Sequence, residues 1–345
     1  MSDSHFGHSS SIQATVRILR AEGSAVRREA IVSAIVANFN GANHLEVCLP
    51  SLQAQSYPAM EIIVSDNGST DASETIARKH GARWHCTGQN RGLAPALNFG
   101  ARAAQGEFFL FLNNDMRFHP DFVRHLVEEL IRDPETFAAD AVQFNWQGDQ
   151  QVHLLTRLTK RANQGSMSMR LLPGLYTHQE APETVAPSFM ASAANMMARR
   201  SMFEALGGFD ERLPLGYEDV ELCWRAWTRR WKTVFVPAAV CWHHVSASSR
   251  SAVARRMGYR GVIKGRLLLA TKLLPFRYAI AAWSVTAAGL GKELATVQGR
   301  RSLDRMQILG EYVRRLPALI RERRSVFRSA DTTAEKVLDQ LLQIA

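Results

Sequence analysis

Short apolar runs, each followed by polar residues, recur along the first third of the chain. The clearest runs are Ile31–Ala37, Glu61–Ser65 and Phe108–Leu112, and Arg83–Thr87 is a weaker example. Apolar runs of this length, bounded by turn residues, are typical of strands buried in a parallel sheet. We therefore predict four strands in this part of the chain.

Segments with helical periodicity separate these strands. Leucines recur at helical spacing after the first strand, and Thr70–His80 and Leu93–Ala104 predict two further helices, the first capped by Ser69 or Thr70. This alternation indicates an α/β protein whose sites lie at the carboxyl edge of a mostly parallel sheet. No G-x-G-x-x-G follows the first strand and no P-loop lysine motif is present. Their absence argues against an ordinary dehydrogenase and against a P-loop NTPase.

The pattern is less regular in the middle of the chain. Phe137–Phe144 and Thr233–Val236 predict strands, whereas Arg199–Leu206 and Asp219–Trp231 predict helices, with Asp219 able to cap the second. Residues 146–184 are polar and irregular. A loop of that size inside a compact domain is usually functional or partly disordered.

Composition excludes several classes of protein. Hydrophobic residues make up 46% of the chain and charged residues 21%, which is sufficient for a buried core. The four cysteines form no C-x-x-C pair, so we expect neither a disulfide framework nor a cysteine zinc site. The uncharged stretch Tyr278–Gly291 is too short to span a membrane, and the N-terminus lacks a signal peptide pattern.

Positive charge is concentrated in one amphipathic segment. Residues 250–330 hold 18 Lys and Arg against 4 Asp and Glu, whereas residues 1–249 hold 23 against 25. Such a segment can be a solvated helical face. It can also lie on anionic lipid headgroups, with apolar residues such as Leu267 and Trp283 at the acyl boundary. Nucleic acid is disfavoured as a partner, because no known reading motif accompanies the charge.

Carboxylates follow two of the predicted strands and begin one predicted helix. Asp66 and Asp115 should open on the same edge of the sheet. The oxygen-rich turn Asn113-Asn114-Asp115 suits a hard divalent cation that keeps substrate phosphates as further ligands, although Asp and Asn also simply terminate strands. Glu218-Asp219 can be catalytic, or it can be an acidic helix start favoured by the helix dipole.

Six motifs in order resemble those of the family 2 glycosyltransferases, and more narrowly the rhamnosyltransferase-like branch that builds bacterial surface polysaccharides. The motifs are Ile31–Asn40, Ser65–Asp71, Gln89–Gly92, Leu112–Asp115, Gly207–Glu211 and Glu218-Asp219. The resemblance covers roughly residues 31–275 and implies a GT-A fold. We expect a flexible N-terminal arm at 1–29, a GT-A domain at 30–250, and a helical, basic, membrane-associating region at 251–345.

The resemblance implies donor-binding positions at the sheet edge, with Asp66 facing the base of the nucleotide. The expected donor-binding residues are Ala37, Asn38, Asp66, Asn90, Gly92, Asn113 and Asn114.

The resemblance also implies positions for the cation and the base. Asp115 stands where the family keeps its metal carboxylate for Mg or Mn, and His243 or His244 can supply a further ligand, with His243 favoured by alignment. Asp219 falls on the position of the catalytic base, with Glu218 beside it. A helix N-terminus lowers the pKa of a carboxylate whereas burial raises it, and the sequence does not weigh the two.

The implied reaction is an inverting, metal-dependent transfer of a sugar from a UDP- or dTDP-linked donor. The acceptor is a hydroxyl of a polymeric or polyprenyl-linked bacterial glycan, and the enzyme is expected in the cytoplasm, peripheral on the inner face of the cell membrane. A carboxylate would remove the proton of the hydroxyl, and a cation would stabilise the leaving diphosphate. Asn113 replaces the first carboxylate of strict D-x-D enzymes, so a catalytically inactive binding protein with this fold is the alternative.

Overall fold

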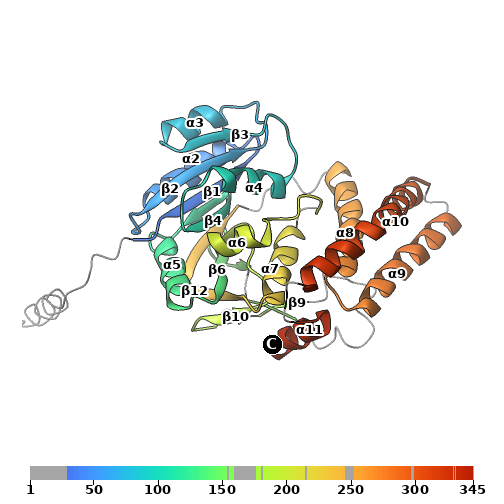
Figure 1. Cartoon of the computed structure of the whole chain (residues 1–345). Coiled ribbons are helices and arrows are strands. Elements are labelled where there is room, and N and C mark those ends of the chain that lie inside the picture. The colour runs from blue at the N-terminus through green and yellow to red at the C-terminus, as the bar shows by residue number, and fades with distance from the viewer. Residues whose placement is uncertain are drawn as a thin grey trace, which may run out of the picture. The chain divides into compact units, whose positions relative to one another are not determined.

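The computed structural model describes residues 29–153, 155–158, 176–179, 182–213, 216–244, 252–296, 299–328, 330 and 332–344. Residues from Ile31 onward belong to one compact unit, shown in Figure 1. Nearly all of the expected arm at 1–29, and much of the loop at 146–184, lie outside the described residues. The expected boundary at residue 250 stays a prediction.

The described chain contains twelve strands and ten helices. The strands are β1 Val32–Asn38, β2 Met60–Asp66, β3 Arg83–Cys86, β4 Phe108–Asn113, β5 Met116–Phe118, β6 Thr136–Asn145, β7 Gln151–His153, β8 Leu155–Leu158, β9 Tyr176–Gln179, β10 Ala186–Ser188, β11 Asn195–Arg199 and β12 Lys232–His243. The helices are α2 Ala42–Gln53, α3 Ser73–Lys79, α4 Leu93–Ala103, α5 Phe122–Arg132, α6 Arg200–Leu206, α7 Glu218–Thr228, α8 Ala252–Lys272, α9 Phe276–Ala295, α10 Gly299–Arg328 and α11 Ala334–Gln343.

Ten of the strands form one mixed sheet. Its order is β10-β12-β6-β11-β4-β1-β2-β3, with β5 added to β12 and β7 to β6. β1 is parallel to β2 and β4, β3 is parallel to β2, and β6 is parallel to β12. β11 is antiparallel to both β4 and β6, so β4 and β6 point the same way. The predicted α/β class, with a mostly parallel central sheet, flanking helices and a C-terminal helical region, is confirmed.

Burial on both faces explains why the central strands read as continuous apolar runs. β1 and β4 are buried along almost their whole length, because helices cover the sheet on both sides. α4 packs on β1 and β2, and α5 packs on β6 and β12. The approach of α4 requires Gly100, since a Cβ there would stand 2.5 Å from the Ile35 Cγ2 atom.

Several elements differ from the prediction. α3 begins at Ser73, later than predicted, and has no side-chain cap, because the residues before it bind the loop after β1: the Thr70 N–H donates to Asn40 Oδ1 at 2.9 Å and Asp71 Oδ2 accepts from the Ala42 N–H at 3.0 Å. β12 is longer than the predicted Thr233–Val236, since β5, β6 and β10 all pair with it. α5, β5, the short strands β7 to β10 and the central strand β11 were not predicted. α7 begins one residue before Asp219, which lies in the first turn instead of capping the helix.

The C-terminal helices α8, α9 and α10 pack against one another, and α10 and α11 contact α7 (Figure 1). Across the part of the chain that the structure describes, none of the helices combines the length and the hydropathy that a bilayer crossing requires.

Candidate active site

The predicted donor-binding residues converge at the carboxyl edge of the sheet. In the parallel register, Asn38 of β1 lies opposite Asp66 of β2, and Ala37 lies opposite Asn113 of β4. Asn114 follows directly and donates from Nδ2 to Asn38 Oδ1 at 2.6 Å. The structure therefore brings these five residues together.

Asp66 is fully buried and orders the turn that ends β2. Its Oδ1 atom accepts hydrogen bonds from Asn38 Nδ2 at 2.9 Å and from the Ser69 hydroxyl at 2.5 Å. Its Oδ2 atom accepts from the backbone N–H groups of Gly68 at 3.0 Å and Ser69 at 2.7 Å. These internal donors already surround the carboxylate. The expected contact of Asp66 with a nucleotide base stays a prediction.

Asn90 and Gly92 lie in an exposed loop. Asn67, which was not among the predicted site residues, holds this loop in place. Asn67 donates from Nδ2 to Asn90 Oδ1 and to the Gly92 carbonyl, each at 3.0 Å, and its Oδ1 accepts from the Arg91 N–H at 2.9 Å. Asn67 itself is buried. The position of Asn67 between Asp66 and Gly68, in the polar turn after a predicted strand, could have identified it from the sequence.

The two candidate histidines differ in their relation to Asp115. The Nε2 atom of His243 lies 3.1 Å from Asp115 Oδ1, and its Nδ1 atom lies 3.2 Å from Gln143 Oε1. His244 instead donates its backbone N–H to the Asp115 carbonyl at 2.8 Å, and its ring centroid lies 5.5 Å from that of His44. Only His243 therefore directs its side chain to the carboxylate.

Asp115 and His243 fit a divalent cation as a pair of ligands. Within the described residues, no group of three or more His, Cys, Asp or Glu side chains is arranged to hold a metal ion. Their separation of 3.1 Å is that of a hydrogen-bonded ion pair, and two ligands at right angles on an octahedral ion would also be about 3 Å apart. A cation bound here would depend on donor phosphates for further ligands.

A cavity of 330 Å³ connects His243, the partner of Asp115, to the acidic start of α7. Its lining includes Asn113, His243, Glu218 and Asp219. Leu93, which follows Gly92, lines it as well. The structure thus brings predicted donor-binding, metal-binding and catalytic positions onto one cavity.

The two carboxyls at the start of α7 are buried, and burial raises the pKa of each. Burial, with a smaller effect of the Asp219 charge, raises the pKa of Glu218 to about 8. Burial also raises the pKa of Asp219, opposed by hydrogen bonds from the N–H groups of Val220 at 2.8 Å and Ala193 at 3.4 Å. Burial therefore outweighs the helix N-terminus here. Both carboxyls therefore hold a proton to a higher pH than exposed carboxyls do.

A buried pair that sequence reasoning missed lies beside Asp219. His153 Nε2 stands 2.7 Å from Asp140 Oδ2, and His153 lines the cavity. Burial alone would lower the pKa of His153, but the negative charges of Asp140 and, more weakly, Asp219 raise it. A single carboxylate inside the apolar strand Phe137–Phe144 was the available signal, because a buried carboxylate requires a partner.

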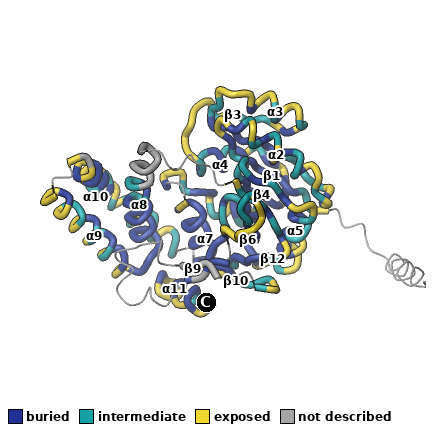
Figure 2. Tube along the Cα trace, turned by 180° about the vertical axis from the view of Figure 1, so that it is seen from behind, coloured by how far each residue is buried: buried dark blue, intermediate teal, exposed yellow. Residues whose placement is uncertain are grey.

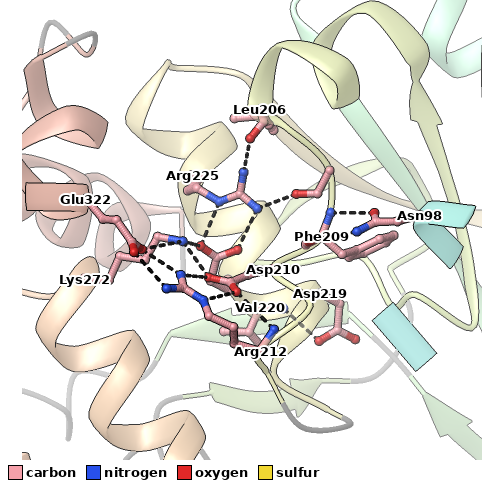
Figure 3. A network of polar contacts seen from close by, with 12 residues as sticks. Asn98, Leu206, Phe209, Asp210, Arg212, Asp219, Val220, Arg225, Lys272 and Glu322 are labelled. Atoms are coloured by element: carbon pink, nitrogen blue, oxygen red, sulfur yellow. Dashed lines mark hydrogen bonds and ion pairs between the residues drawn. The ribbon is translucent and has the colours of Figure 1, made fainter. Parts of the chain in front are cut away.

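An ion network fixes the helix that carries Glu218 and Asp219 (Figure 3). Glu221, fully buried one turn into α7, accepts two hydrogen bonds from Arg225, at 2.8 Å and 2.7 Å. Lys272, the last residue of α8, stands 2.7 Å from Glu221 and 2.9 Å from Asp210. Burial would raise the pKa of Glu221, but the charges of Arg225 and Lys272 lower it.

The network extends to the loop before α7 and to α10. Arg212 binds both oxygens of Asp210 and both oxygens of Glu322 of α10. Arg225 also donates hydrogen bonds to the carbonyls of Leu206 and Gly208. These bonds hold the loop against α7. Three cations thus meet three carboxylates, and they join the loop, α7, α8 and α10.

Comparison with known sequences identifies relatives. The sequence profile of the family described as Glycosyl transferase family 2 matches residues 33–207. An uncharacterized glycosyltransferase of Rickettsia typhi is 37% identical over 101 residues, and the match spans only 32% of that protein and 29% of this chain. The N-acetylglucosaminyl-diphospho-decaprenol L-rhamnosyltransferase of Mycobacterium tuberculosis is 26% identical over 240 residues, which are 64% of this chain and 78% of that protein.

Solved structures share the fold. The mannosyltransferase PcManGT from Pyrobaculum calidifontis, in complex with GDP-Man and Mn2+, superposes with a TM-score of 0.51 at 17% identity, over 92% of this chain and 94% of that one. GalNAc-T7 with UDP, GalNAc and Mn2+ gives a TM-score of 0.52 at 17% identity, over 72% and 51%. At such identities the likeness concerns the fold alone.

We expect Lys272→Met to lower the free energy of unfolding by about 3–5 kcal/mol, because it leaves two buried carboxylates with too few cations. Lys264→Met is the matched control on the same helix. Lys264 pairs with Glu311 at 3.0 Å, but both side chains are more than a quarter exposed, so about 0–1 kcal/mol is expected. Urea unfolding of both variants measures the difference, and equal losses would contradict a special role for the network.

Glu218→Gln should stabilise the protein increasingly as the pH rises. The pKa of Glu218 is higher in the folded chain than its ordinary value of 4.5, so the folded state binds more protons between pH 4.5 and about 8 and loses stability across that window. Removing the group should restore on the order of 5 kcal/mol above pH 8 and almost nothing below pH 4.5.

Glu221→Gln is the matched control for this pH dependence. The pKa of Glu221 is lowered in the folded chain, so its ionised form contributes stability above the ordinary pKa, and the variant should be destabilised at neutral pH. Urea unfolding at pH 3, 5, 7 and 9 compares the two variants. The loss in Glu221→Gln should be constant from pH 5 to 9 and shrink at pH 3, whereas the gain in Glu218→Gln should grow from pH 5 to 9. A gain that grows from pH 5 to 9 in both variants would contradict the opposite pKa shifts.

Proposed function

This chain belongs to glycosyl transferase family 2, and we propose that it transfers a sugar, with inversion, from a nucleoside diphosphate donor to a hydroxyl of a bacterial glycan. The observation that carries the proposal is the 330 Å³ cavity that Asn113, His243, Glu218 and Asp219 share. A direct displacement needs one base on the acceptor side and one positive centre on the diphosphate side, and this cavity offers residues for both.

Asp219 is proposed as the base that takes the proton of the acceptor hydroxyl. A carboxylate with a raised pKa is a better base at neutral pH than an exposed one. Two backbone N–H groups donate to its carboxyl and favour the ionised form, whereas burial raises the pKa of Glu218 to about 8. His153 is paired with Asp140 beside Asp219, and the charges of both carboxylates raise its pKa. We assign Glu218 and His153 to setting the charge of Asp219.

Asp115 and His243 are proposed as the protein ligands of a divalent cation, Mg or Mn. When bound, the cation would stabilise the negative charge that develops on the leaving nucleoside diphosphate. Both solved structures described above contain Mn2+. Asn113 and Asn114 lie beside this pair and would orient the donor, with Ala37, Asn38 and the loop of Asn90 and Gly92 nearby. UDP- and dTDP-sugars are the donors proposed.

The acceptor is proposed to be a polyprenyl-linked or polymeric glycan at the inner face of the cell membrane. Support comes from the name of the mycobacterial relative, which specifies N-acetylglucosaminyl-diphospho-decaprenol as its acceptor. Further support comes from the charge of residues 250–330, because lysine and arginine near a surface are attracted to anionic headgroups. The protein would then be cytoplasmic and peripheral on the membrane.

Incubation of the chain with a panel of UDP-, dTDP- and GDP-sugars, Mn2+ and a polyprenyl diphosphate sugar tests the function. Mass spectrometry should detect a new glycolipid and an equal amount of nucleoside diphosphate, and EDTA should abolish both. Donor binding without cleavage, for every donor and acceptor, would instead support the inactive binding protein, which the single carboxylate at Asp115 keeps as the alternative.

Asp219→Asn should reduce kcat by at least ~10²-fold, because the general base is lost, and should leave the donor Kd nearly unchanged. Glu218→Gln is the matched control: Glu218 carries a proton near pH 7 in the wild type, so its variant should keep turnover within about tenfold. Turnover and calorimetric donor titration are measured for both. Turnover close to that of the wild type in Asp219→Asn would remove this residue from the base role.

Asp115→Ala and His243→Ala should each weaken Mn2+-dependent donor binding by about tenfold or more, since each removes one of two protein ligands. His244→Ala is the control, because its ring packs near His44 and does not reach the Asp115 carboxylate. Calorimetric titration of the donor with and without Mn2+ measures these effects. Equal losses for the two histidine variants would contradict the assignment of His243.

A further inference from the structure

An open groove lies between α9 and α10, on the helical part of the chain. It has a volume of 860 Å³, within the range of pockets that hold drug-sized ligands. From α9 it is lined at helical spacing by residues that include Phe276, Ile280 and Trp283, and from α10 by residues that include Ile320 and Phe327. One face of each helix therefore forms one wall.

The apolar side chains of this groove are incompletely covered. Phe276 is 65% exposed and Ile280 is 55% exposed. Figure 2 shows exposed stretches on α9 and α10, in yellow. Contiguous apolar surface left open to water marks a binding site in most soluble proteins. The walls therefore suit a flexible hydrocarbon ligand.

Positive charge accompanies the apolar walls. Arg323 and Arg324 line the groove. Arg323 is held in place by donating from Nη1 to the carbonyls of Leu274 at 2.6 Å and Thr271 at 3.3 Å. Within the described residues, no carboxylate forms an ion pair with either arginine. Guanidinium groups without carboxylate partners suit a phosphate, which they bind through paired N–H donors.

We propose that this groove binds the isoprenoid chain of a polyprenyl phosphate lipid, with Arg323 and Arg324 at its phosphate. The proposal rests on the proposed function, since the lipid would be the carrier of the acceptor sugar. An apolar channel with a cationic element matches an amphiphile that has one hydrocarbon chain and an anionic end. A nucleic acid would gain nothing from the apolar walls.

The groove is close to the candidate active site along α8. Gly265 of α8 packs on the ring of Tyr217, the residue before Glu218, and a Cβ at Gly265 would stand 2.6 Å from that ring. Thr271 of the same helix lines the groove. Six residues of helix rise about 9 Å, so the groove begins less than two turns further along α8 than the residue that touches Tyr217.

Binding of farnesyl diphosphate to the full chain in EDTA tests the proposal, because EDTA removes the cation from the donor site. Ile280→Glu should raise the Kd of this probe by at least ~tenfold, since it places a charge where the hydrocarbon would lie. Leu294→Glu is the matched control: Leu294 is on the same helix and 57% exposed, but it does not line the groove. Both positions are exposed, so both variants should fold.

Two further measurements identify the ligand and its position. The emission of Trp283, whose Nε1 donates to the Thr271 hydroxyl at 3.0 Å, should shift to shorter wavelength on binding, and Trp283→Phe should abolish the shift. Pyrophosphate, which lacks the chain, should not cause it. Equal affinity of both glutamate variants, or competition by pyrophosphate as strong as that by unlabelled farnesyl diphosphate, would overturn the proposal. The proposal would also be overturned if the chain forms a dimer that Ile280→Glu dissociates while the Kd of farnesyl diphosphate stays unchanged.

Turnover separates the failure of this proposal from failure of the proposed function. With a water-soluble acceptor sugar, Ile280→Glu should match the wild type, and with the polyprenyl-linked acceptor its KM should rise. An unchanged KM would refute the groove while the transferase function stands. If the wild type transfers no sugar at all but binds farnesyl diphosphate in the groove, the function fails and the binding site stands.

Discussion

The exclusion of water from a carboxylate is the constraint on which the candidate site depends. A buried carboxyl group must meet a cation or keep its proton, and the first turn of α7 contains both outcomes. Arg225 and Lys272 bind Glu221 and lower its pKa, whereas no cation among the described residues forms an ion pair with Glu218, and burial raises its pKa to about 8. Burial raises the pKa of Asp219 as well, although two backbone N–H groups bind its carboxyl. The chemistry of the cavity thus follows from the placement of cations a few residues apart.

This placement makes the C-terminal helices part of the candidate site. Lys272 belongs to α8 and Glu322 to α10, yet both complete the network that holds the loop of Asp210 and the helix of Glu221. Thr271, the neighbour of Lys272, faces the apolar groove. Adjacent residues at the end of α8 therefore contact the network of α7 on one side and the proposed lipid site on the other. A ligand in the groove would act next to the lysine that positions the acidic helix.

The sequence predicted the part of the structure that depends on local pattern. The strands that carry Asn38, Asp66 and Asn113 were identified because buried parallel strands read as continuous apolar runs, and parallel register then places their ends together. The cap of α3 was mispredicted, because Thr70 and Asp71 bind the loop after β1 and the helix begins only at Ser73. Local propensity does not reveal that a loop about 30 residues earlier in the chain will bind these residues.

The unpredicted residues depend on contacts between distant segments. His153 lies in a stretch with little periodicity, and only its pairing with Asp140 gives it a place beside Asp219. Likewise, Arg212 and Lys272 read as ordinary surface cations in the sequence. Their partners stand 110 and 62 residues away, and no spacing rule connects them.

The span of the ion network has a consequence for how the chain is made. Arg212 and Glu322 are separated by 110 residues, and a ribosome adds about 5–20 residues each second. About 5–20 s therefore pass between synthesis of the loop and arrival of its last carboxylate partner. The sheet can fold once β12 has been made, at residue 243, whereas Lys272 and Glu322 are still to come. Until Lys272 has been made, Arg225 of the same helix is the cation that binds Glu221.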